Sequence, residues 1–382
     1  MRAEHVLIVQ RRLPHYRVPF FARLRDRLAA DGVQLQLAVG QATPQEAMKR
    51  DAGELDWAQS APCRYLLGNR LCWQQLGPAL AQADRVIVTQ ENKLLNNLAL
   101  LGGPRRRRVA LWGHGTNLQA RPGLGSRAAQ VFKTQMSRRA DWWFAYTELS
   151  AGLFRDMGIP AQRLTVINNA VDTHALRQQV LAFRQLPAAA LRREAGLPEG
   201  PLAVFIGSLY TDKRLDLLLD AAAQLRAELP GFQLAIAGAG PLMAPLQAQT
   251  ARQPWVHWLG PVLAQRKARL LATADVMLNP GLVGLGILDA FAAGLPLITT
   301  DCGVHSPEIA YLQPGVNGLM CAPQATALAQ TALQLWREPL LAQRLRVGSE
   351  AAAEHYGLDQ MVERFTAGVL QWRHDRPLGG PS

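Results

Sequence analysis

The sequence has few cysteines, and their spacing indicates neither a metal site nor a disulfide framework. Its 382 residues include only four, Cys63, Cys72, Cys302 and Cys321, and none lies in a CxxC pattern. We expect reduced thiols with structural roles, as in a cytoplasmic protein, and no metal requirement. No two aspartates lie two positions apart, so a DxD metal–diphosphate motif is also absent.

Long apolar runs and nucleotide-cofactor fingerprints are missing as well. No stretch of about 18 uncharged apolar residues occurs, so we expect no membrane span. The short apolar run at the N-terminus predicts a first strand rather than a secretory signal. The loop after it, QRRLPHYR, contains no glycine, and GAG at 238–240 lacks the third glycine of a dinucleotide fingerprint. The missing dinucleotide fingerprint disfavours a dehydrogenase. Walker A and GxSxG motifs are also absent, which disfavours the enzymes that carry those motifs.

Acidic residues are too few in the first half to balance the basic ones. The net charge is +12: residues 1–175 hold 24 Lys/Arg against 13 Asp/Glu, and residues 176–382 hold 17 against 16. Such a one-sided field favours an anionic partner, namely a membrane surface, an anionic substrate or a nucleic acid. A solvated basic face explains it equally well. We expect no nucleic acid, because RNP-type and zinc-finger patterns are absent.

What the sequence does contain is an alternation of apolar runs and helical patterns. Hydrophobic residues make up 49% and charged residues 18%, enough for a large core. The first half predicts strands at 5–10, 33–40, 85–90, 107–115, 142–148 and 163–172, and helices between them, including 126–141. The second half predicts a strand at 201–208, a strand and turn over 232–241, strands at 256–260 and 276–280, and a loop, helix and strand over 280–300, followed by NGLMCA (317–322) and terminal helices. Alternation of this kind, occurring twice, predicts an α/β protein with two doubly wound parallel sheets, which bind ligands at their carboxyl strand ends.

Several segments of the second half occur together in the order and spacing of one family. They are VFIGSLYTDKRLDLLLDAA (204–222), AIAGAGPL (235–242), WLGPV (258–262), ADVMLNPGLVGLGILDAFAAGLPLITT (274–300) and PEIAYLQPGVNGL (307–319). With these motifs the chain resembles the family 4 (group 1) glycosyltransferases, retaining enzymes of GT-B architecture. The likeness is close over 204–319 and looser in the N-terminal half.

The resemblance implies two Rossmann-like domains facing a cleft. Residues 1–172 would bind the acceptor, residues 173–355 would bind a nucleotide sugar, and a helix at 356–375 would pack back toward the first domain. The implied donor-binding residues are Ser208, Lys213, Arg214, Gly240, Val262, Gly281, Val283, Gly284, Leu285 and Asp289.

Lys213 follows a predicted strand, where an ammonium could bind a phosphate oxygen and stabilise a leaving diphosphate. The alternative is a surface lysine at the start of a helix over 214–229. The family often has a phosphate-binding arginine where this chain has Ser208, and Arg214 is a partial substitute. Gly240 belongs to a turn that lies by the diphosphate in the family.

The stretch PGLVGLGILDAFAAG combines glycines with one acid. Gly281, Gly284 and Gly286 leave backbone amides accessible at a helix start, which is an anion-binding arrangement. By resemblance Asp289 holds the ribose hydroxyls; the alternative is a capping or ion-paired acid. The family usually has Glu, seven residues, then Glu. Here the first acid is replaced by Gly281, whose amide we expect to serve the sugar or a phosphate.

The first half contains the residues that are expected to bind the acceptor. His114, in LWGHGTN, resembles the cleft histidine of the family, and its flanking glycines suggest an open loop. With Lys213 and Gly281 it makes up the expected catalytic set. The first loop carries the expected acceptor-binding residues Arg11, His15, Tyr16 and Arg17, with Arg12 beside them. The basic run 105–108 suits either anionic lipid head groups or plain solvation. His305 and Glu308 suit either donor contacts or structural roles.

These features predict a retaining, hexosyl-type glycosyltransferase that moves a sugar from a nucleoside-diphosphate sugar to an acceptor hydroxyl. We expect it in lipid-linked or cell-surface polysaccharide and lipopolysaccharide synthesis, in the cytoplasm at the inner membrane face. Two alternatives stay open. The missing glutamate and arginine suit a non-catalytic nucleotide-sugar-binding subunit, and the architecture also suits a sugar-nucleotide epimerase.

Overall fold

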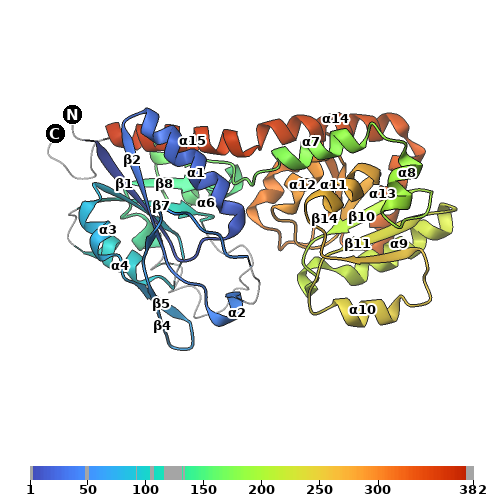
Figure 1. Ribbon diagram of the computed structural model, residues 1–382, viewed down its shortest axis with the longest axis horizontal. Helices are drawn as coiled ribbons and strands as arrows, with labels where there is room; N and C mark the ends of the chain where they lie inside the picture. Colours follow the sequence, from blue (N-terminus) through green and yellow to red (C-terminus); the bar gives the residue numbers. More distant parts are fainter. Residues whose placement is uncertain are drawn as a thin grey trace. The chain divides into compact units, whose positions relative to one another are not determined.

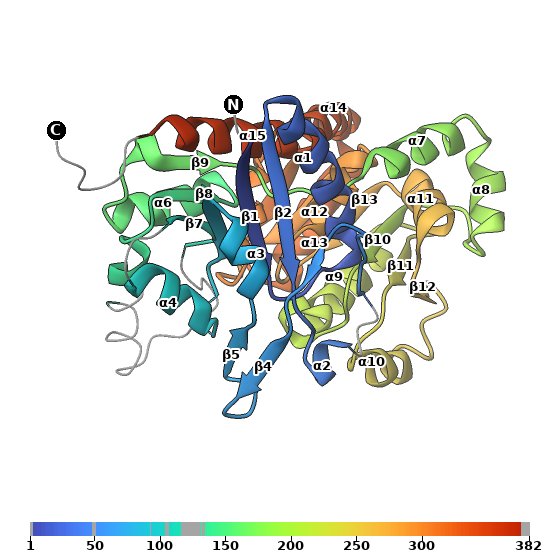
Figure 2. The same cartoon turned by 60° about the vertical axis from the view of Figure 1, so that its left-hand side comes forward.

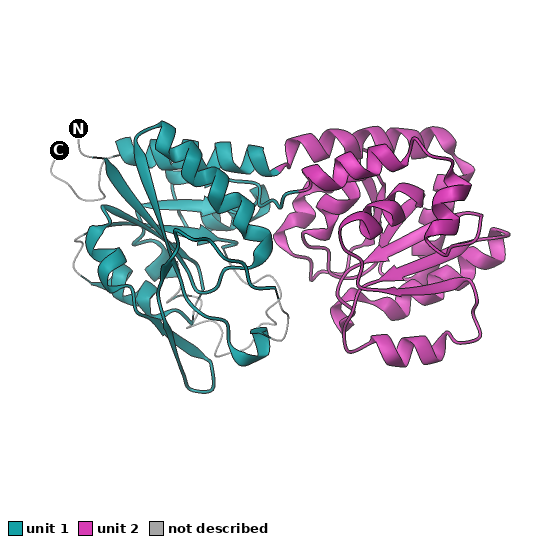
Figure 3. Cartoon of the chain, viewed as in Figure 1, with its two compact units in different colours: residues 1–172, 358–382 teal, residues 173–357 magenta. Residues whose placement is uncertain are grey.

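The computed structural model describes residues 3–47, 51–91, 93–103, 107–115, 131 and 134–375. The chain divides into two compact units (Figure 3): residues 1–172 with 358–382, and residues 173–357. Each unit is built on one parallel sheet with helices on both faces (Figure 1). The predicted α/β class with two doubly wound sheets is therefore confirmed. Of the helix predicted at 126–141, residues 126–130, 132 and 133 lie outside the described residues, and residues 131 and 134–137 are helical.

The sheet of the first unit has seven strands in the order β3-β2-β1-β6-β7-β8-β9, all parallel. Their bounds are β1 Glu4–Gln10, β2 Val33–Val39, β3 Gln59–Ser60, β6 Arg85–Thr89, β7 Arg108–Gly113, β8 Trp142–Ala145 and β9 Leu164–Val166. The strand order reverses between β1 and β6. The carboxyl ends of these two strands therefore border the switch point at which doubly wound sheets bind ligands.

Two helices distant in sequence cover one face of this sheet together. They are α1 (Val18–Ala30) and α15 (Leu358–His374), which lie side by side in Figures 1 and 2. Aromatic rings fill the space between these helices and the sheet; the rings of Phe144 and Phe365 stack at 4.3 Å. Among the described residues, the other helices of the unit are η1 His15–Arg17, α2 Pro44–Ala47, α3 Gly77–Gln82, α4 Leu95–Gly102, α6 Glu148–Asp156 and η2 Ala161–Arg163.

The sheet of the second unit has six strands in the order β12-β11-β10-β13-β14-β15, again parallel. Their bounds are β10 Leu202–Ile206, β11 Gln233–Ala237, β12 Val256–Gly260, β13 Val276–Asn279, β14 Leu297–Thr300 and β15 Gly318–Cys321. In chain order this is the 3-2-1-4-5-6 arrangement of a dinucleotide-type sheet. Its switch point lies between β10 and β13.

The helices of the second unit pack apolar side chains onto both faces of the sheet, with Phe205, Phe232 and Leu218 fully buried on one of them. Their bounds are α7 His174–Phe183, α8 Ala188–Glu194, η3 Thr211–Lys213, α9 Leu215–Glu228, α10 Met243–Gln249, α11 Ala264–Thr273, α12 Gly286–Ala292, η4 Pro307–Tyr311, α13 Ala325–Arg337 and α14 Pro339–His355.

Two strands of the first unit end earlier than the sequence predicts. The strand predicted over 163–172 is only β9, because Asn168 adopts a left-handed conformation (φ 50°) that ends the extended backbone. The strand predicted over 142–148 ends at Ala145. Thr147 instead caps α6, its side-chain oxygen accepting a hydrogen bond from the amide of Ser150.

Candidate functional site

Two loops meet at the switch point of the second sheet. One follows β10 and leads into η3, and the other follows β13 over residues 280–285. Their backbones touch, since the amide of Leu282 donates to the carbonyl of Asp212 at 2.7 Å. The predicted donor residues on these two loops therefore lie together, at the place where doubly wound sheets bind ligands.

Lys213 ends η3 and reaches the second of these loops. Its ammonium donates to the carbonyl oxygen of Leu282, and burial lowers the pKa of Lys213 although the Asp212 carboxylate acts in the other direction. The alternative of a solvated lysine at a helix start does not fit this position. An ammonium has three N–H donors, so two of those of Lys213 have no acceptor among the described residues.

Gly281 is a glycine because the backbone of η3 lies against it. A Cβ atom at this position would lie 2.6 Å from the Cα of Lys213 and closer still to the carbonyl oxygen of Asp212. Backbone atoms cannot move aside as a flexible side chain can. The glutamate that the family carries here therefore has no room between these loops, and the departure from the family pattern is a feature of their packing.

The glycine-rich loop presents fewer amides to a ligand than the sequence suggests. The amide of Val283 donates to Nδ1 of His305 at 3.1 Å, and that of Leu282 is used by Asp212. The amides of Gly284 and Leu285 have no acceptor among the described residues. The amide of Gly281 likewise has no acceptor there. The donors that this loop offers to an anion therefore include the amides of Gly281, Gly284 and Leu285, and Lys213 contacts the same loop.

His305 holds the loop in place rather than facing a ligand. Because Nδ1 accepts from Val283, Nε2 carries the proton, and it donates to the carbonyl of Thr300 at 2.8 Å. Burial lowers the pKa of His305, with a smaller contribution from the Lys213 ammonium, while the hydrogen bond to Thr300 and the Asp301 carboxylate act in the other direction. Both ring nitrogens are used inside the unit, which favours the structural role. Glu308 is buried as well.

Asp289, one turn into α12, forms an ion pair. Its Oδ1 accepts from Nζ of Lys267 on α11 at 2.8 Å, and its side chain is 18% exposed. The structure thus contains the ion-paired acid that sequence analysis kept as the alternative. The second oxygen, Oδ2, has no partner among the described residues and can still accept a hydroxyl hydrogen bond.

Three further predicted donor residues lie on neighbouring loops of the same sheet edge. Ser208 is exposed after β10, and Val262 is buried after β12. Gly240 follows β11, where a Cβ would lie 2.7 Å from the carbonyl carbon of Leu209. Its lack of a side chain therefore lets the loops after β10 and β11 pack against each other.

The Arg214 side chain forms an ion pair with an acid of the helix that follows it. Its backbone is left-handed (φ 50°), and its guanidinium pairs with the Asp216 carboxylate at 3.2 Å, at the start of α9. In this arrangement it does not replace the arginine that the family often has at position 208.

In the first unit, a cavity of about 300 Å³ opens at the carboxyl ends of β1, β6 and β7. Its position is the switch point of that sheet, and its size is at the lower end of ligand pockets. The predicted residues Arg11, Tyr16, Arg17 and His114 all line it, whereas the exposed His15 does not. The structure therefore brings together most of the expected acceptor side within one unit.

His114 lies on a packed loop, so the predicted open loop is wrong for residues 113–115. The amide of Gly115 donates to Oε1 of Gln90 at 3.0 Å. A Cβ at Gly113 would lie 2.6 Å from the Cβ of Gln90, so this glycine is needed for close approach. The His114 ring lies 5.9 Å from that of Tyr146, which follows β8 and also lines the cavity.

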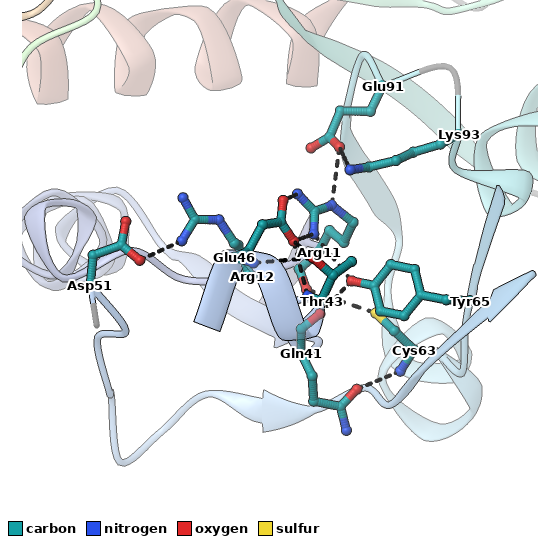
Figure 4. Close-up of polar contacts among 10 residues, drawn as sticks. All are labelled: Arg11, Arg12, Gln41, Thr43, Glu46, Asp51, Cys63, Tyr65, Glu91 and Lys93. Carbon is teal, nitrogen blue, oxygen red and sulfur yellow. Dashed lines mark hydrogen bonds and ion pairs between the residues drawn. The ribbon is translucent and has the colours of Figure 1, made fainter. Parts of the chain in front are cut away.

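Arg11 is fixed by carboxylates (Figure 4). Its guanidinium binds Glu46 through two hydrogen bonds of 2.7 Å and Glu91 at 3.1 Å. Glu46 is itself positioned by a capping box, because Thr43 donates to it through its amide and its hydroxyl, both at 3.0 Å. The Arg11 guanidinium lowers the pKa of Glu46 to about 2. Arg11 thus serves as an anchor of the cavity wall.

The other predicted basic residues also bind within the protein. Arg12 pairs with Asp51 at 2.7 Å (Figure 4). Of the run 105–108, the last two residues lie in the described part. Arg107 donates to the carbonyl of Ala83 at 2.9 Å, and Arg108 pairs with Asp375 at 2.9 Å. These contacts do not favour lipid binding by this run.

Glu46→Gln is expected to destabilise the first unit by about 1–2 kcal/mol at neutral pH, after allowing for the solvent that reaches this pair. The pKa of Glu46 is lowered in the folded state, so its contribution is complete above the ordinary glutamate pKa and disappears as pH falls toward 2. Urea unfolding of both proteins between pH 7 and pH 3 measures the difference. Glu148→Gln, at an exposed pair with Arg155, should change little; an equal effect of both variants at all pH values would contradict the account.

Sequence reasoning missed several residues of these sites. Lys267 precedes its partner Asp289 by 22 positions on another helix, and nothing local marks it. Trp112 and Tyr146 line the cavity and lie near the carboxyl ends of the strands predicted over 107–115 and 142–148, which is a usable signal. Thr43 and Glu46 form a T-x-x-E capping box that was readable in the sequence.

Within the described ranges, no group of three or more His, Cys, Asp or Glu side chains is placed to hold a metal ion. No helix in that part of the chain is both long and apolar enough to cross a bilayer.

Comparison with protein families places a known domain in the second unit. Residues 200–338 match the model described as "Glycosyl transferases group 1". This region includes both loops of the switch point, with Lys213, Gly281 and Asp289. A group 1 glycosyltransferase region is therefore confirmed there.

Curated relatives extend the likeness beyond that region. The putative colanic acid biosynthesis glycosyltransferase WcaL of Salmonella typhimurium is 25% identical over 285 residues, which are 70% of this chain and 65% of the relative. The D-rhamnosyltransferase WbpZ of Pseudomonas aeruginosa is 31% identical over 156 residues, 39% of each chain. The match thus spans about two thirds of the first relative's length and less of the second.

Solved structures show the same fold over nearly the whole chain. Anabaena Alr3699/HepE in complex with UDP superposes with a TM-score of 0.70 at 17% identity, covering 96% of this chain and 99% of that one. The apo lipopolysaccharide outer core galactosyltransferase WaaB gives 0.64 at 14% identity, with coverage of 96% and 99%. The predicted GT-B type of fold is confirmed by this likeness.

Proposed function

We propose that this protein is a retaining, hexosyl-type glycosyltransferase that transfers a sugar from a nucleoside-diphosphate sugar to an acceptor hydroxyl. The observation that carries the proposal is the cluster at the switch point of the second sheet. There the Lys213 ammonium binds the carbonyl oxygen of Leu282, in the same loop as the amides of Gly284 and Leu285 and within the region that matches group 1 glycosyltransferases. A cation next to unsatisfied amides suits a diphosphate.

Each residue of this cluster has a proposed task. Lys213 and the amides of Gly284 and Leu285 bind the diphosphate and stabilise its charge as the glycosidic bond breaks. Gly281 allows η3 and the 280–285 loop to approach closely enough for this. Asp289 accepts a ribose hydroxyl through Oδ2, while Lys267 holds its other oxygen. The reaction as proposed requires no metal.

The cavity of the first unit is proposed to receive the acceptor. His114, on a loop held by Gln90, offers an imidazole to a sugar hydroxyl. Tyr16 and Arg17, which follow the first strand, line the same cavity. The names of WcaL and WbpZ, which refer to colanic acid and rhamnosyl transfer, support an acceptor in cell-surface polysaccharide or lipopolysaccharide synthesis.

Peripheral attachment at the inner membrane face is part of this proposal, and a hairpin supports it. Strands β4 (Cys63–Leu66) and β5 (Leu71–Gln74) pair antiparallel and extend away from the sheet in Figures 1 and 2. The tip exposes Leu66 and Leu67, the latter 72% exposed, with Trp73 behind them. The neighbouring side chains of Arg64 and Arg70 are also exposed. Leucine, tryptophan and arginine together suit an anionic lipid interface.

The double variant Leu66→Ser/Leu67→Ser is expected to bind vesicles of phosphatidylglycerol and phosphatidylethanolamine about tenfold more weakly, because two exposed leucines no longer enter the interface. Sedimentation of the full chain with vesicles measures this. Leu340→Ser removes an exposed leucine of α14 and serves as control. Wild-type protein that stays in the supernatant, or equal binding of all three, would contradict attachment by the hairpin.

The transfer reaction is tested by incubating the protein with nucleotide sugars and a membrane extract that contains lipid-linked glycans. Proton NMR of the product gives the anomeric configuration, which should equal that of the donor. An inverted product would exclude the retaining mechanism.

A second candidate is a nucleotide-sugar-binding subunit without catalysis. The packing at Gly281 favours it, because no acidic side chain can occupy that position. It predicts that a donor binds but is neither hydrolysed nor transferred, even with membrane extract present, until a partner chain is added.

A further inference from the structure

The cavity of the first unit contains a buried arginine that no carboxylate neutralises. Arg17, just before α1, is 6% exposed and lines the cavity. Its guanidinium donates to the side-chain oxygen of Asn169 and contacts the sulfur of Met361 at 3.8 Å. No acidic side chain among the described residues pairs with it. The segments outside those residues contain no aspartate or glutamate, so every acidic side chain of the protein has been considered.

The other cations around the cavity are matched by acids. Arg11 has Glu46 and Glu91, and Arg12 has Asp51. Lys93 lies 3.5 Å from Glu91. Counted over the described residues, the ionised side chains of this group are four cations and three carboxylates: Arg11, Arg12, Arg17 and Lys93 with Glu46, Asp51 and Glu91. Within the part of the chain that the structure describes, the positive charge in excess belongs to Arg17, which is buried to the same extent as Arg11.

Aromatic faces fix the Arg17 guanidinium without neutralising it. Its central carbon lies 5.5 Å from the ring of Tyr16 and 5.4 Å from that of Trp112, and both residues line the cavity. Ring faces and a neutral amide attract a cation, but they do not replace a counter-ion for a charge removed from water. A planar, oriented guanidinium without a carboxylate is prepared for an oxyanion, which it can bind through two parallel hydrogen bonds.

We propose that Arg17 forms an anion subsite in this cavity and binds a phosphate or carboxylate group of the ligand. That the ligand is the sugar acceptor rests on the proposed function. The acceptor of this protein then carries a negative charge next to the sugar that receives the transfer, either as a sugar phosphate or as a uronic acid. A neutral oligosaccharide leaves Arg17 without its counter-ion.

Calorimetric titration with inorganic phosphate tests the subsite, using the full chain that carries Lys213→Ala so that the second unit contributes no phosphate site of its own. Adding Arg17→Gln should weaken phosphate binding about tenfold or more, as for loss of a charged hydrogen-bonding group. Arg17→Lys keeps the charge but not the planar fork and should fall between the two. Arg25→Gln, in helix α1 that Arg17 precedes, is the matched control, because Arg25 also stacks on an indole, that of Trp57, but lies outside the cavity.

Phosphate binding that survives Arg17→Gln, or that Arg25→Gln reduces equally, would overturn the proposal. If Arg17→Gln does not fold, Arg17→Lys still decides, since unchanged binding in it contradicts the two-bond geometry. Titrations with glucose 1-phosphate, glucuronate and glucose then identify the class of anion, and tightest binding of glucose would also overturn it. A nucleotide-sugar titration of the wild type tests the proposed function separately, because its failure leaves the Arg17-dependent result unchanged.

Discussion

Lys213→Ala is expected to reduce donor turnover by about 10²- to 10³-fold, the usual effect of removing one group that stabilises charge in a transition state. The ammonium is held against the 280–285 loop by the carbonyl of Leu282, and the same loop carries the amides of Gly284 and Leu285. Loss of this charge should weaken both the ground-state binding of the diphosphate and its departure. Donor hydrolysis measured as kcat/KM gives the size of the effect.

Lys213→Arg is the matched control, because it keeps the positive charge at all accessible pH values. Burial lowers the pKa of Lys213, so the wild-type ammonium loses its proton at a lower pH than an ordinary lysine. Wild-type donor affinity should therefore fall as pH rises into the alkaline range, while that of Lys213→Arg stays flat. Parallel pH profiles of the two proteins, or full activity of Lys213→Ala, would contradict a phosphate contact.

Gly281→Ala is expected to disrupt the same site through the backbone. Its Cβ would overlap the carbonyl of Asp212 and the Cα of Lys213, so η3 must move away from the loop at a cost of about 1–3 kcal/mol. The hydrogen bond from Leu282 to Asp212 should break, which hydrogen exchange of the Leu282 amide detects. Donor affinity should fall about tenfold or more, since about 1.4 kcal/mol corresponds to a factor of ten.

Gly286→Ala separates this effect from the general loss of a glycine. Gly286 begins α12 only five residues later, and a Cβ there would approach no neighbour closer than the carbonyl of Ile206 at 3.9 Å. Its stability should equal or exceed that of the wild type, and its Leu282 amide should exchange no faster. If Gly281→Ala behaves like Gly286→Ala, the close packing of η3 on this loop is not what requires the glycine.

Much of the sheet architecture was predictable because buried parallel strands read as continuous apolar runs. The run at 5–10 became β1, the run at 256–260 became β12, and Gly32 ends α1 with φ 74° as a helix stop. The β4–β5 hairpin escaped prediction, because its strands are only four residues each and are partly exposed, so their apolar pattern is weak. Its turn includes Leu67 and Asn69 at positive φ, which no pattern indicates.

The candidate site was predictable as a set of loops but not as a set of contacts. Motif order identified Lys213 and Asp289, yet nothing local could show that Lys267 pairs with Asp289 or that Gly281 supports the backbone of η3. Such pairs depend on which strands lie side by side, and the sequence pattern does not encode that directly. The same reason explains why Arg11 and Arg17, six residues apart in one loop, differ so strongly: acids at 46 and 91 reach only the first.

The central claim is that the switch point of the second sheet binds a nucleoside-diphosphate sugar. The most direct test is calorimetric titration of the full chain with UDP-, GDP-, ADP- and TDP-sugars, alongside Asp289→Ala and, as control, Asp220→Ala at an exposed acid of α9. We predict that one donor binds, that Asp289→Ala weakens it about tenfold through the lost ribose hydrogen bond, and that Asp220→Ala leaves it unchanged. If none of these nucleotide sugars binds the wild-type protein, the claim is wrong.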